Sequence, residues 1–331
     1  MRLQRNAAFL LTLMALVALA AGCGGSSAPA KSASAPSHAD VPRFGHVFLI
    51  VGENTSAAQI TAAHAPFLTG TLKPKAAWLT NYHSLKKSSS LGQYIALVSG
   101  QYTKCEANND LPAQCHQSVA NLFQQLDSSG RTWREWNESM DNACDYVDHG
   151  SAWSKNIYSA HHNAAIYFTG IEGGLYDEAK TPKSACLKDD LSMGTTAPND
   201  TTAFDLALLA GKVGNFNLVV PNDCENGHDP CDTKDPVKQF DDFLKREVPK
   251  IESTPSFGRD GLIIVTWDEG ADPPHDPGHV LAVLIGPQVK PGTYAGRAVD
   301  HFGMSRALAG GFGLTPLANA RNARPLPALW K

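Results

Sequence analysis

The chain has 331 residues, of which 43% are hydrophobic and 18% are charged, and its formal net charge is -4. Acidic and basic residues are mixed along the chain, and no basic block stands out. This distribution excludes the electrostatic footprint of a nucleic-acid-binding protein, so we expect no nucleic acid partner. The length that follows the N-terminal segments is normal for a single α/β enzyme.

The first 22 residues have the pattern of a signal peptide. Arg2 and Arg5 precede an apolar run at 7–21, which is too short for a typical membrane span. Small residues stand directly before Cys23, as in a bacterial lipobox. We predict a signal peptide at 1–22 and lipidation of Cys23, and an ordinary cleaved signal is the alternative. The protein is then exported, either lipid-anchored to the cell envelope or secreted, and its membrane contact is through the lipid anchor only.

Residues 23–43 consist of the candidate anchor cysteine and a segment rich in Ser, Ala, Pro and Gly. Such a segment buries too little apolar surface to offset its ordering entropy, so we predict a flexible tether. No second apolar run of membrane-spanning length follows, so we expect a soluble body. We predict that residues 44–331 form one domain.

Six cysteines remain besides Cys23, and an even number in an exported chain favours disulfides. The close pairs Cys105–Cys115 and Cys224–Cys231 are natural partners, which leaves Cys144–Cys186. This is the simplest of several pairings. A zinc cluster is the rival interpretation, and the chain lacks the CxxC spacing typical of such clusters.

Continuous apolar runs predict strands that are covered on both faces, at 46–51, 216–220, 261–267 and 280–285. Helical patterns lie between these runs: one opens at the serine cluster and ends at Gly100, one is capped by Ser118 and ends at Gly130, one is capped by Thr201 or Thr202 and ends at Gly211, and an amphipathic helix covers 237–251. This alternation predicts an α/β fold of three layers, with a mainly parallel central sheet and helices on both faces.

Polar side chains follow three of the predicted strands. Glu53 and Asn54 follow the first, the loop 221–229 follows the second, and Asp268 and Glu269 follow the third. Any one carboxylate here could be a helix cap, but three strand ends of a parallel sheet meet at one edge, where ligands bind. Oxygen ligands suit Ca²⁺, Mg²⁺ or Mn²⁺, and imidazole would add Zn²⁺ or Fe. We therefore predict one divalent metal ion.

A serine cluster at 88–90 opens the helical run that ends at Gly100. The N-terminus of a helix attracts anions such as phosphate, and a metal could activate a serine there as a nucleophile. The structural alternative is that a serine simply caps a core helix.

Six segments then carry a resemblance to a known family. They are His46–Asn54, Ser90–Gly100, His162–Phe168, Pro221–Asp229, Gly261–Glu269 and Gly278–Arg306. In this order they resemble the bacterial phosphoesterase family that contains acid phosphatases and phospholipases C, within the alkaline-phosphatase-like superfamily. The resemblance covers the chain from His46 to the C-terminus and implies an alkaline-phosphatase-like fold.

The resemblance also implies roles for individual residues. Ser90 is the implied nucleophile, which forms a phosphoseryl intermediate, and His162 and His228 are the implied phosphate ligands or proton donors. The implied metal ligands are Glu53, Asn54, Asp268 and Glu269. A histidine acid with an unperturbed pKa of about 6.5 favours a mildly acidic optimum.

Further candidates for the site are His83, Asp229, His279 and His301. His279 begins a strand, so we expect it at the far end of the sheet unless the preceding loop folds back. His301 precedes a helix and could be its cap. We interpret Asp223 and Glu225 as residues that either interact with solvent or form turns of the loop.

The implied function is a metal-dependent phosphoric ester hydrolase, most simply an acid-phosphatase-like phosphomonoesterase, with phosphoinositides such as phosphatidylinositol 3-phosphate among its candidate substrates. No separate lipid-binding domain is visible, which disfavours the alternative, a phospholipase C-type phosphodiesterase. The sequence departs from the family pattern at Ser88, Gln93 and Ala164. An alternative of another class is therefore a non-catalytic surface lipoprotein that binds phosphate-bearing ligands. No obligate protein partner is predicted.

Overall fold

The computed structural model describes residues 41–86, 88–103, 105, 107–172, 184–231, 233–271, 276 and 278–331. The predicted signal peptide, Cys23 and all but the end of the predicted tether lie outside the described residues. From Val41 onward, the described residues belong to one compact unit. No helix in the described ranges is long and apolar enough to cross a membrane.

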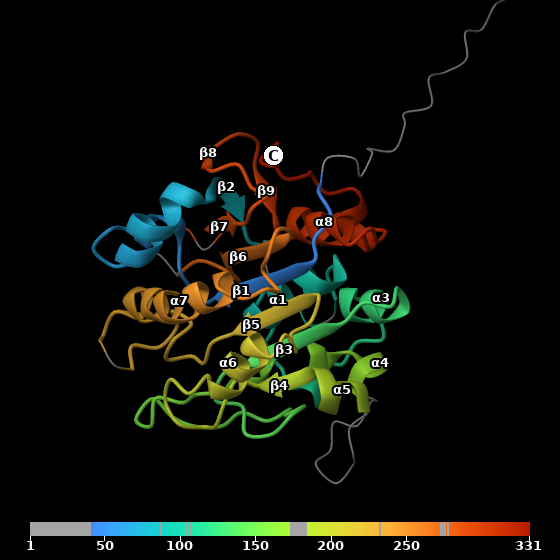
Figure 1. Cartoon of the computed structure of the whole chain (residues 1–331). Helices are drawn as coiled ribbons and strands as arrows, with labels where there is room; N and C mark the ends of the chain where they lie inside the picture. The colour runs from blue at the N-terminus through green and yellow to red at the C-terminus, as the bar shows by residue number, and fades with distance from the viewer. Residues whose placement is uncertain are drawn as a thin grey trace, which may run out of the picture. The chain divides into compact units, whose positions relative to one another are not determined.

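One sheet crosses this unit (Figure 1), and the strands described in it follow the order β4-β3-β5-β1-β6-β7-β2-β8, with β9 paired to β2. Their bounds are β1 (His46–Gly52), β2 (Ala77–His83), β3 (Trp133–Asn137), β4 (Asp190–Ser192), β5 (Phe216–Val220), β6 (Gly261–Trp267), β7 (His279–Ile285), β8 (Gly292–Tyr294) and β9 (Val299–Asp300). The four predicted apolar runs form β1, β5, β6 and β7. β1 lies between β5 and β6 and is buried from Val47 to Gly52, which explains its continuous apolarity.

The helices described are α1 (Ser90–Ser99), α2 (Pro112–Cys115), α3 (Leu122–Ser128), α4 (Thr169–Glu172), α5 (Ser184–Asp189), α6 (Thr202–Leu209), α7 (Pro236–Glu252) and α8 (His301–Gly311). Two tryptophans of β3 show that helices cover both faces of the sheet. Trp133 packs on Phe123 of α3, and Trp136 packs on Phe204 of α6. Because side chains alternate along a strand, α3 and α6 lie on opposite faces. The predicted three-layer α/β architecture is confirmed.

Capping explains where the predicted helices begin and end. Gly100 ends α1 in the left-handed conformation, with φ 67°. Asn121, and not Ser118, caps α3, because the Asn121 side chain accepts a hydrogen bond from the backbone N–H of Gln124. The interpretation of His301 as a cap is wrong for a similar reason: Asp300 caps α8 by accepting from the N–H of Gly303.

The direction of β7 corrects the expected position of His279. β7 is antiparallel to both of its neighbours, β6 and β2, whereas the other paired strands described are parallel. The start of β7 therefore lies beside the end of β2, where His279 pairs with His83. His279 lies at the carboxyl-terminal edge of the parallel strands and not at the far end of the sheet.

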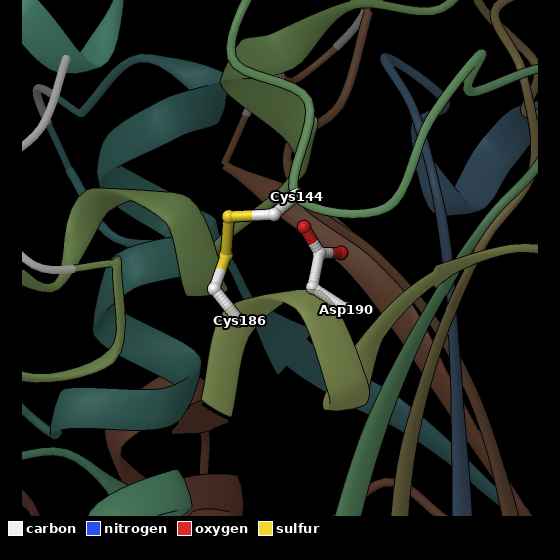
Figure 2. A group of neighbouring side chains, drawn as sticks. All are labelled: Cys144, Cys186 and Asp190. Atoms are coloured by element: carbon white, nitrogen blue, oxygen red, sulfur yellow. A yellow bond between two sulfur atoms is a disulfide. The ribbon is translucent and has the colours of Figure 1, made fainter. Parts of the chain in front are cut away.

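Three disulfides join Cys105 to Cys115, Cys144 to Cys186 and Cys224 to Cys231. This is the simplest pairing that the spacing suggests, and such bonds are typical of proteins that mature in an oxidising compartment. Figure 2 shows Asp190 beside the Cys144–Cys186 bond. These three residues are close enough to form a metal-ligand group, but both sulfur atoms are bonded to each other. Since zinc binds thiolates, this group is no zinc site.

Candidate active site

The centre of the site is a contact between three buried side chains from different elements. Glu53 follows β1, Ser90 begins α1, and His162 ends the short 3₁₀ helix Ala160–His162. The Ser90 hydroxyl donates to Oε2 of Glu53 at 3.2 Å. Oε1 of Glu53 lies 3.4 Å from Nε2 of His162. The fold therefore brings together three of the residues that the sequence singled out.

Asp268 joins this cluster because β1 and β6 are adjacent, with Gly52 opposite Trp267. Its Oδ1 accepts from the backbone N–H of Asn54 at 3.1 Å, whereas its Oδ2 has no hydrogen-bond partner in the described part of the chain. Burial and the nearby carboxylates of Glu53 and Glu269 raise the pKa of Asp268 well above its usual value. A buried carboxylate in this state favours a bound cation.

Asn54 and Glu269 border the cluster and are less buried than Glu53 and Asp268. Asn54 has a positive φ of 42°, a conformation that Asn tolerates better than most residues. Its backbone N–H, and not its side chain, makes the contact with Asp268. The structure therefore shows a close carboxylate pair with two further oxygen-bearing side chains at its edge.

Asp223 and Tyr94 hold His162, and the sequence analysis assigned neither of them to the site. Nδ1 of His162 lies 3.0 Å from Oδ1 of Asp223, and the rings of His162 and Tyr94 stack with centroids 5.4 Å apart. Asp223 lies in a turn of the loop, as one alternative predicted, but the solvated alternative is wrong, because Asp223 is only 6% exposed and pairs with His162. One signal could have revealed Tyr94: it follows Ser90 by four positions and so shares its face of α1.

The charges of His162 and Asp223 stabilise each other. Burial acts to lower the pKa of His162, but the carboxylates of Glu53 and Asp223 outweigh it and raise this pKa well above its usual value. Burial acts to raise the pKa of Asp223, but His162 and the hydroxyl of Ser159 outweigh it and hold this pKa at about 2. The pKa of Glu53 is lowered in the same way, because His162 outweighs the effect of burial. Glu53 and Asp223 are thus favoured as ionised carboxylates and His162 as the protonated ring, whereas the pKa of Asp268 is shifted in the opposite direction.

His228 and Asp229 lie at the edge of the site on the loop 221–229. The His228 side chain is 40% exposed, and its Nδ1 lies 2.9 Å from Oδ1 of Asp229. Its charge lowers the pKa of both Glu53 and Asp223, so it is within electrostatic reach of the centre. Gly227 lets this loop approach closely, because a Cβ there would lie 3.1 Å from the carbonyl oxygen of Glu53.

The other candidate histidines bind backbone carbonyl groups. The rings of His83 and His279 stack with centroids 5.2 Å apart. His83 hydrogen-bonds the carbonyl oxygen of Gly278 and the side-chain oxygen of Asn81, and His279 hydrogen-bonds the carbonyl oxygen of Thr80. His301 borders the cluster at Asp268, with its Nε2 2.7 Å from the carbonyl oxygen of Asp268. Burial lowers the pKa of His301 to about 4, which favours its neutral form. None of these three rings contacts Ser90.

A support cluster of two further buried carboxylates, Glu135 and Asp190, fixes the segment after His162. Glu135 of β3 accepts hydrogen bonds from the backbone N–H groups of Ala164 and Ala165, at 2.7 and 2.8 Å. Asp190 accepts from the Asn163 side chain at 2.9 Å and from the Asn137 side chain at 2.8 Å. No local sequence pattern indicates this cluster, because its members come from segments far apart along the chain.

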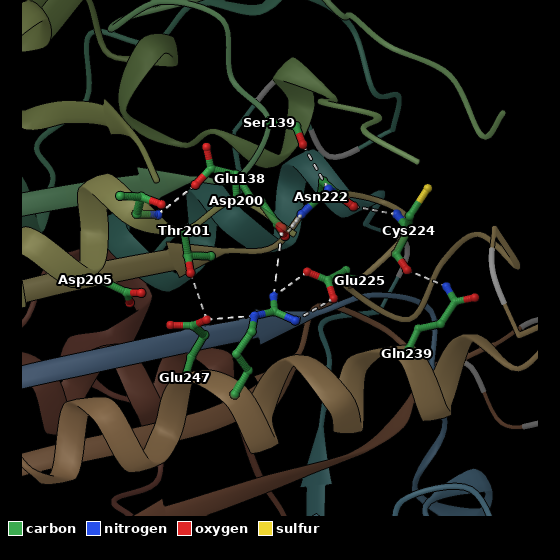
Figure 3. Close-up of polar contacts among 12 residues, drawn as sticks. Glu138, Ser139, Asp200, Thr201, Asp205, Asn222, Cys224, Glu225, Gln239 and Glu247 are labelled. Carbon is green, nitrogen blue, oxygen red and sulfur yellow. Dashed lines mark hydrogen bonds and ion pairs between the residues drawn. The ribbon is translucent and has the colours of Figure 1, made fainter. Parts of the chain in front are cut away.

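An arginine network fixes the loop that carries Asp223. Arg246 of α7 donates to both carboxylate oxygens of Glu225, at 3.0 and 2.5 Å, and to Glu247 at 2.9 Å. Figure 3 shows Glu225 and Glu247 in this network, with the buried Glu138 nearby. Glu225 therefore lies in a turn, as one alternative predicted, and holds the loop in place; the solvated alternative is wrong.

Comparison with known proteins agrees with this geometry. The sequence profile of the Phosphoesterase family matches residues 61–315. The chain belongs to the Phosphoesterase family. This phosphoesterase is therefore a hydrolase of phosphoric esters. It is 25% identical over 291 residues to the phosphatidylinositol-3-phosphatase of Mycobacterium tuberculosis, and the match covers 88% of this chain and 84% of that protein.

Solved structures with the same fold include a member of the alkaline phosphatase superfamily from Vibrio parahaemolyticus. It has a TM-score of 0.59 and 13% sequence identity, and the match covers 87% of the phosphoesterase and 71% of that chain. The lipoteichoic acid synthase LtaP from Listeria monocytogenes has a TM-score of 0.52 and 11% identity, with coverages of 85% and 77%. These likenesses show that the phosphoesterase has the alkaline-phosphatase-like fold that the sequence predicts.

Proposed function

We propose that this phosphoesterase is a metal-dependent phosphomonoesterase in which Ser90 is the nucleophile. The observation that supports this most strongly is the position of the Ser90 hydroxyl, 3.2 Å from Glu53 and at the first residue of α1. The positive end of the α1 dipole favours the phosphate group of a substrate at this place. Attack by Oγ of Ser90 on phosphorus would form a phosphoseryl intermediate and release the alcohol, and water would later release phosphate.

The residues present fit a divalent metal ion. Asp268 has a buried oxygen with no hydrogen-bond partner in the described ranges, and Oε1 of Glu53 faces His162 without forming a hydrogen bond. Carboxylate and hydroxyl oxygens of this kind are ligands for Mg²⁺, Ca²⁺ or Mn²⁺. Glu53 and Asp268, with Asn54 and Glu269 beside them, would hold the ion. When bound, it would lower the pKa of the Ser90 hydroxyl and neutralise phosphate charge.

His162 is the proposed proton donor to the leaving alcohol. Its interactions with Glu53 and Asp223 favour the protonated ring, and the contact with Asp223 fixes the orientation of the ring. His228, at the edge of the site, would bind an oxygen of the phosphate group. This division of roles suits phosphoryl transfer, which depends mainly on positioning and on neutralising charge.

For the substrate, we propose a phosphate monoester on a polyol such as the inositol ring of a phosphoinositide. Support comes from the related phosphatidylinositol-3-phosphatase and from the proposed export of the chain with a lipid at Cys23, which would hold the enzyme near lipid substrates. The domain limits proposed from the sequence, with a signal peptide at 1–22, a tether at 23–43 and an enzyme domain at 44–331, agree with this location.

The test is hydrolysis of para-nitrophenyl phosphate, its phosphodiester analogue and its phosphorylcholine analogue by wild type and Ser90→Ala, with and without a chelator. We expect monoester hydrolysis that chelation abolishes and metal restores, and a loss of at least ~10³-fold in kcat for Ser90→Ala. A preference for the phosphorylcholine ester would instead support a phospholipase C. Absence of turnover after metal repletion would support a non-catalytic phosphate-binding protein.

A further inference from the structure

A cavity of about 350 Å³ lies outside the catalytic cluster. Its walls come from the segment after β2, the segment before α8, Tyr102 and Arg324 near the C-terminus. This volume is in the range of small-ligand sites, which is about 300–1,000 Å³. The cavity has no role in the mechanism proposed above.

The charged groups in the cavity favour an anion. Lys86 and Arg324 both line it and are both exposed. Lys86 has no carboxylate partner in the part of the chain that the structure describes, and Arg324 makes one long hydrogen bond, 3.4 Å, to the carbonyl oxygen of Ala298. Asp300 is the acidic residue of the lining, and one of its oxygens already caps α8. Two cations thus face one carboxylate, which leaves a net positive charge.

The other lining groups suit a ring that carries hydroxyl groups. Tyr102 is 45% exposed, and its ring packs edge-on against Phe302 with centroids 5.2 Å apart. An aromatic ring fixed in this way offers an apolar surface beside polar groups. The second oxygen of Asp300 can accept hydrogen bonds from hydroxyl groups. The lining therefore fits a phosphorylated polyol better than an apolar ligand.

Gln93 connects this cavity rigidly to the catalytic cluster. Its side chain accepts from the backbone N–H of Leu85 and donates to the carbonyl oxygens of Leu85 and Ser88. The segment that carries Lys86 is therefore held on the first turn of α1, which begins with Ser90. Four residues of extended chain span at most about 14 Å, so the Cα atoms of Lys86 and Ser90 are no farther apart than this.

A second connection runs through α8. Asp300 lines the cavity, and its neighbour His301 contacts the carbonyl oxygen of Asp268 at 2.7 Å. The cavity is thus attached to the catalytic cluster at both the Ser90 side and the Asp268 side. A substrate that bridges the two places would carry two anionic groups, one for each place.

We propose that this cavity is an anion subsite that binds a second phosphate of the substrate while Ser90 attacks the first. The substrate class is then a polyol with two phosphate-bearing positions, as in the headgroup of a phosphatidylinositol monophosphate, where one phosphate is a monoester and the other links to the lipid. The inference rests on the proposed function and makes it more specific. The second phosphate can belong to a lipid or to a free bisphosphate, because both present the same group.

The test compares three substrates: para-nitrophenyl phosphate, soluble inositol 1,3-bisphosphate, and phosphatidylinositol 3-phosphate in phosphatidylcholine vesicles. The variant is Lys86→Ala/Arg324→Ala. The matched control, Lys212→Ala/Arg259→Ala, removes the same charge from exposed positions outside the cavity lining. All three proteins are compared by thermal unfolding so that a folding defect is recognised.

We expect the ratio of kcat/KM for the bisphosphate to kcat/KM for para-nitrophenyl phosphate to fall about 10- to 100-fold in the cavity variant, mainly through KM. The same fall is expected for the vesicle substrate, and the control keeps the wild-type ratio. An unchanged ratio would overturn the proposal. A fall restricted to vesicles would also overturn it, because the two cations would then contact the membrane surface and not the second phosphate.

Failure of the proposed function is distinguishable from failure of the subsite. If wild type hydrolyses none of the esters after metal repletion, the catalytic proposal is wrong. The subsite is then tested by calorimetric titration of inositol 1,3-bisphosphate into Ser90→Ala, with and without the two cavity substitutions. We expect at least tenfold weaker binding when the cations are removed, and equal affinity would overturn the proposal.

Discussion

Two pairs of carboxylates in the part of the molecule that the structure describes are equally buried and differ in their hydrogen bonds. In the support cluster, each oxygen of Glu135 and Asp190 accepts from a backbone or side-chain N–H. In the catalytic cluster, one oxygen of Asp268 has no partner in the described residues, and Oε1 of Glu53 faces His162 without a hydrogen bond. All four side chains are 0% exposed. Burial alone therefore does not identify the functional pair, whereas the unsatisfied oxygens do, because leaving a buried acceptor unpaired costs about 1–3 kcal/mol.

The largest expected effect is a loss of turnover when Asp268, in the pair with Glu53, is changed. Asp268→Asn should reduce monoester turnover by at least ~10³-fold, because the metal loses a charged ligand. The same change should leave the chelated protein as stable as wild type or more stable by about 1–3 kcal/mol, because a neutral amide avoids the cost of ionising a buried carboxyl group that has no cation partner. Turnover assays and urea unfolding in the presence of a chelator measure the two effects. A clear loss of stability would mean that Asp268 is structural.

In the support cluster, Glu135 and Asp190 already accept hydrogen bonds through all their carboxylate oxygens. A change there should reduce stability and not turnover itself. Asn163→Ala removes the amide that donates to Asp190 and to the hydroxyl of Tyr158, so we expect a loss of about 2–4 kcal/mol in the free energy of unfolding. Activity should fall mainly because less protein is folded. Urea unfolding tests this, with the exposed Asn142→Ala as the matched control. Equal stabilities of the two variants would contradict the contrast between the clusters.

Asp223 combines features of the two clusters. Both of its carboxylate oxygens accept hydrogen bonds, and it contacts His162, the proposed proton donor. Asp223→Asn should lower kcat/KM by about 10- to 100-fold. It should also lower the pKa of His162, because the Asp223 carboxylate raises it, so the alkaline limb of the pH–rate profile should move to lower pH. A profile at fixed metal concentration measures both effects. An unmoved limb would show that His162 is not the acid.

The smallest expected effect, counted per pH unit, is a dependence of stability on pH. Burial raises the pKa of Asp190 from 3.8 to about 7. The folded state then binds a proton that the unfolded state releases, so the free energy of unfolding should fall as pH rises from about 4 to about 7, by at most ~1.4 kcal/mol per pH unit. Asp190→Asn should flatten this dependence. Urea unfolding at several pH values is the measurement, and an identical slope in both proteins would contradict it.

Much of the catalytic cluster was predictable because its signals are local. Glu53 and Asp268 follow continuous apolar runs, and such runs become adjacent parallel strands whose ends coincide. The rest depends on tertiary contacts that no local pattern contains. Pairing with His162 buries Asp223, and the antiparallel direction of β7 places His279 at the edge of the site. Gln93, where the sequence departs from the family pattern, holds Leu85 and Ser88 against α1 through hydrogen bonds.

The Cys144–Cys186 bond has a consequence for how the site matures. It closes a covalent ring of the chain, and His162 and Asn163 lie inside this ring. Glu53, Ser90 and Asp268 lie outside all three rings that the disulfides close. A disulfide ring restricts the enclosed segment before the sheet has formed. The placement of His162 should therefore depend on thiol oxidation more than the placement of Glu53 and Asp268 does. In a chain exported in its reduced form, the half of the site that carries the proposed proton donor would form only after the chain leaves the reducing cytoplasm.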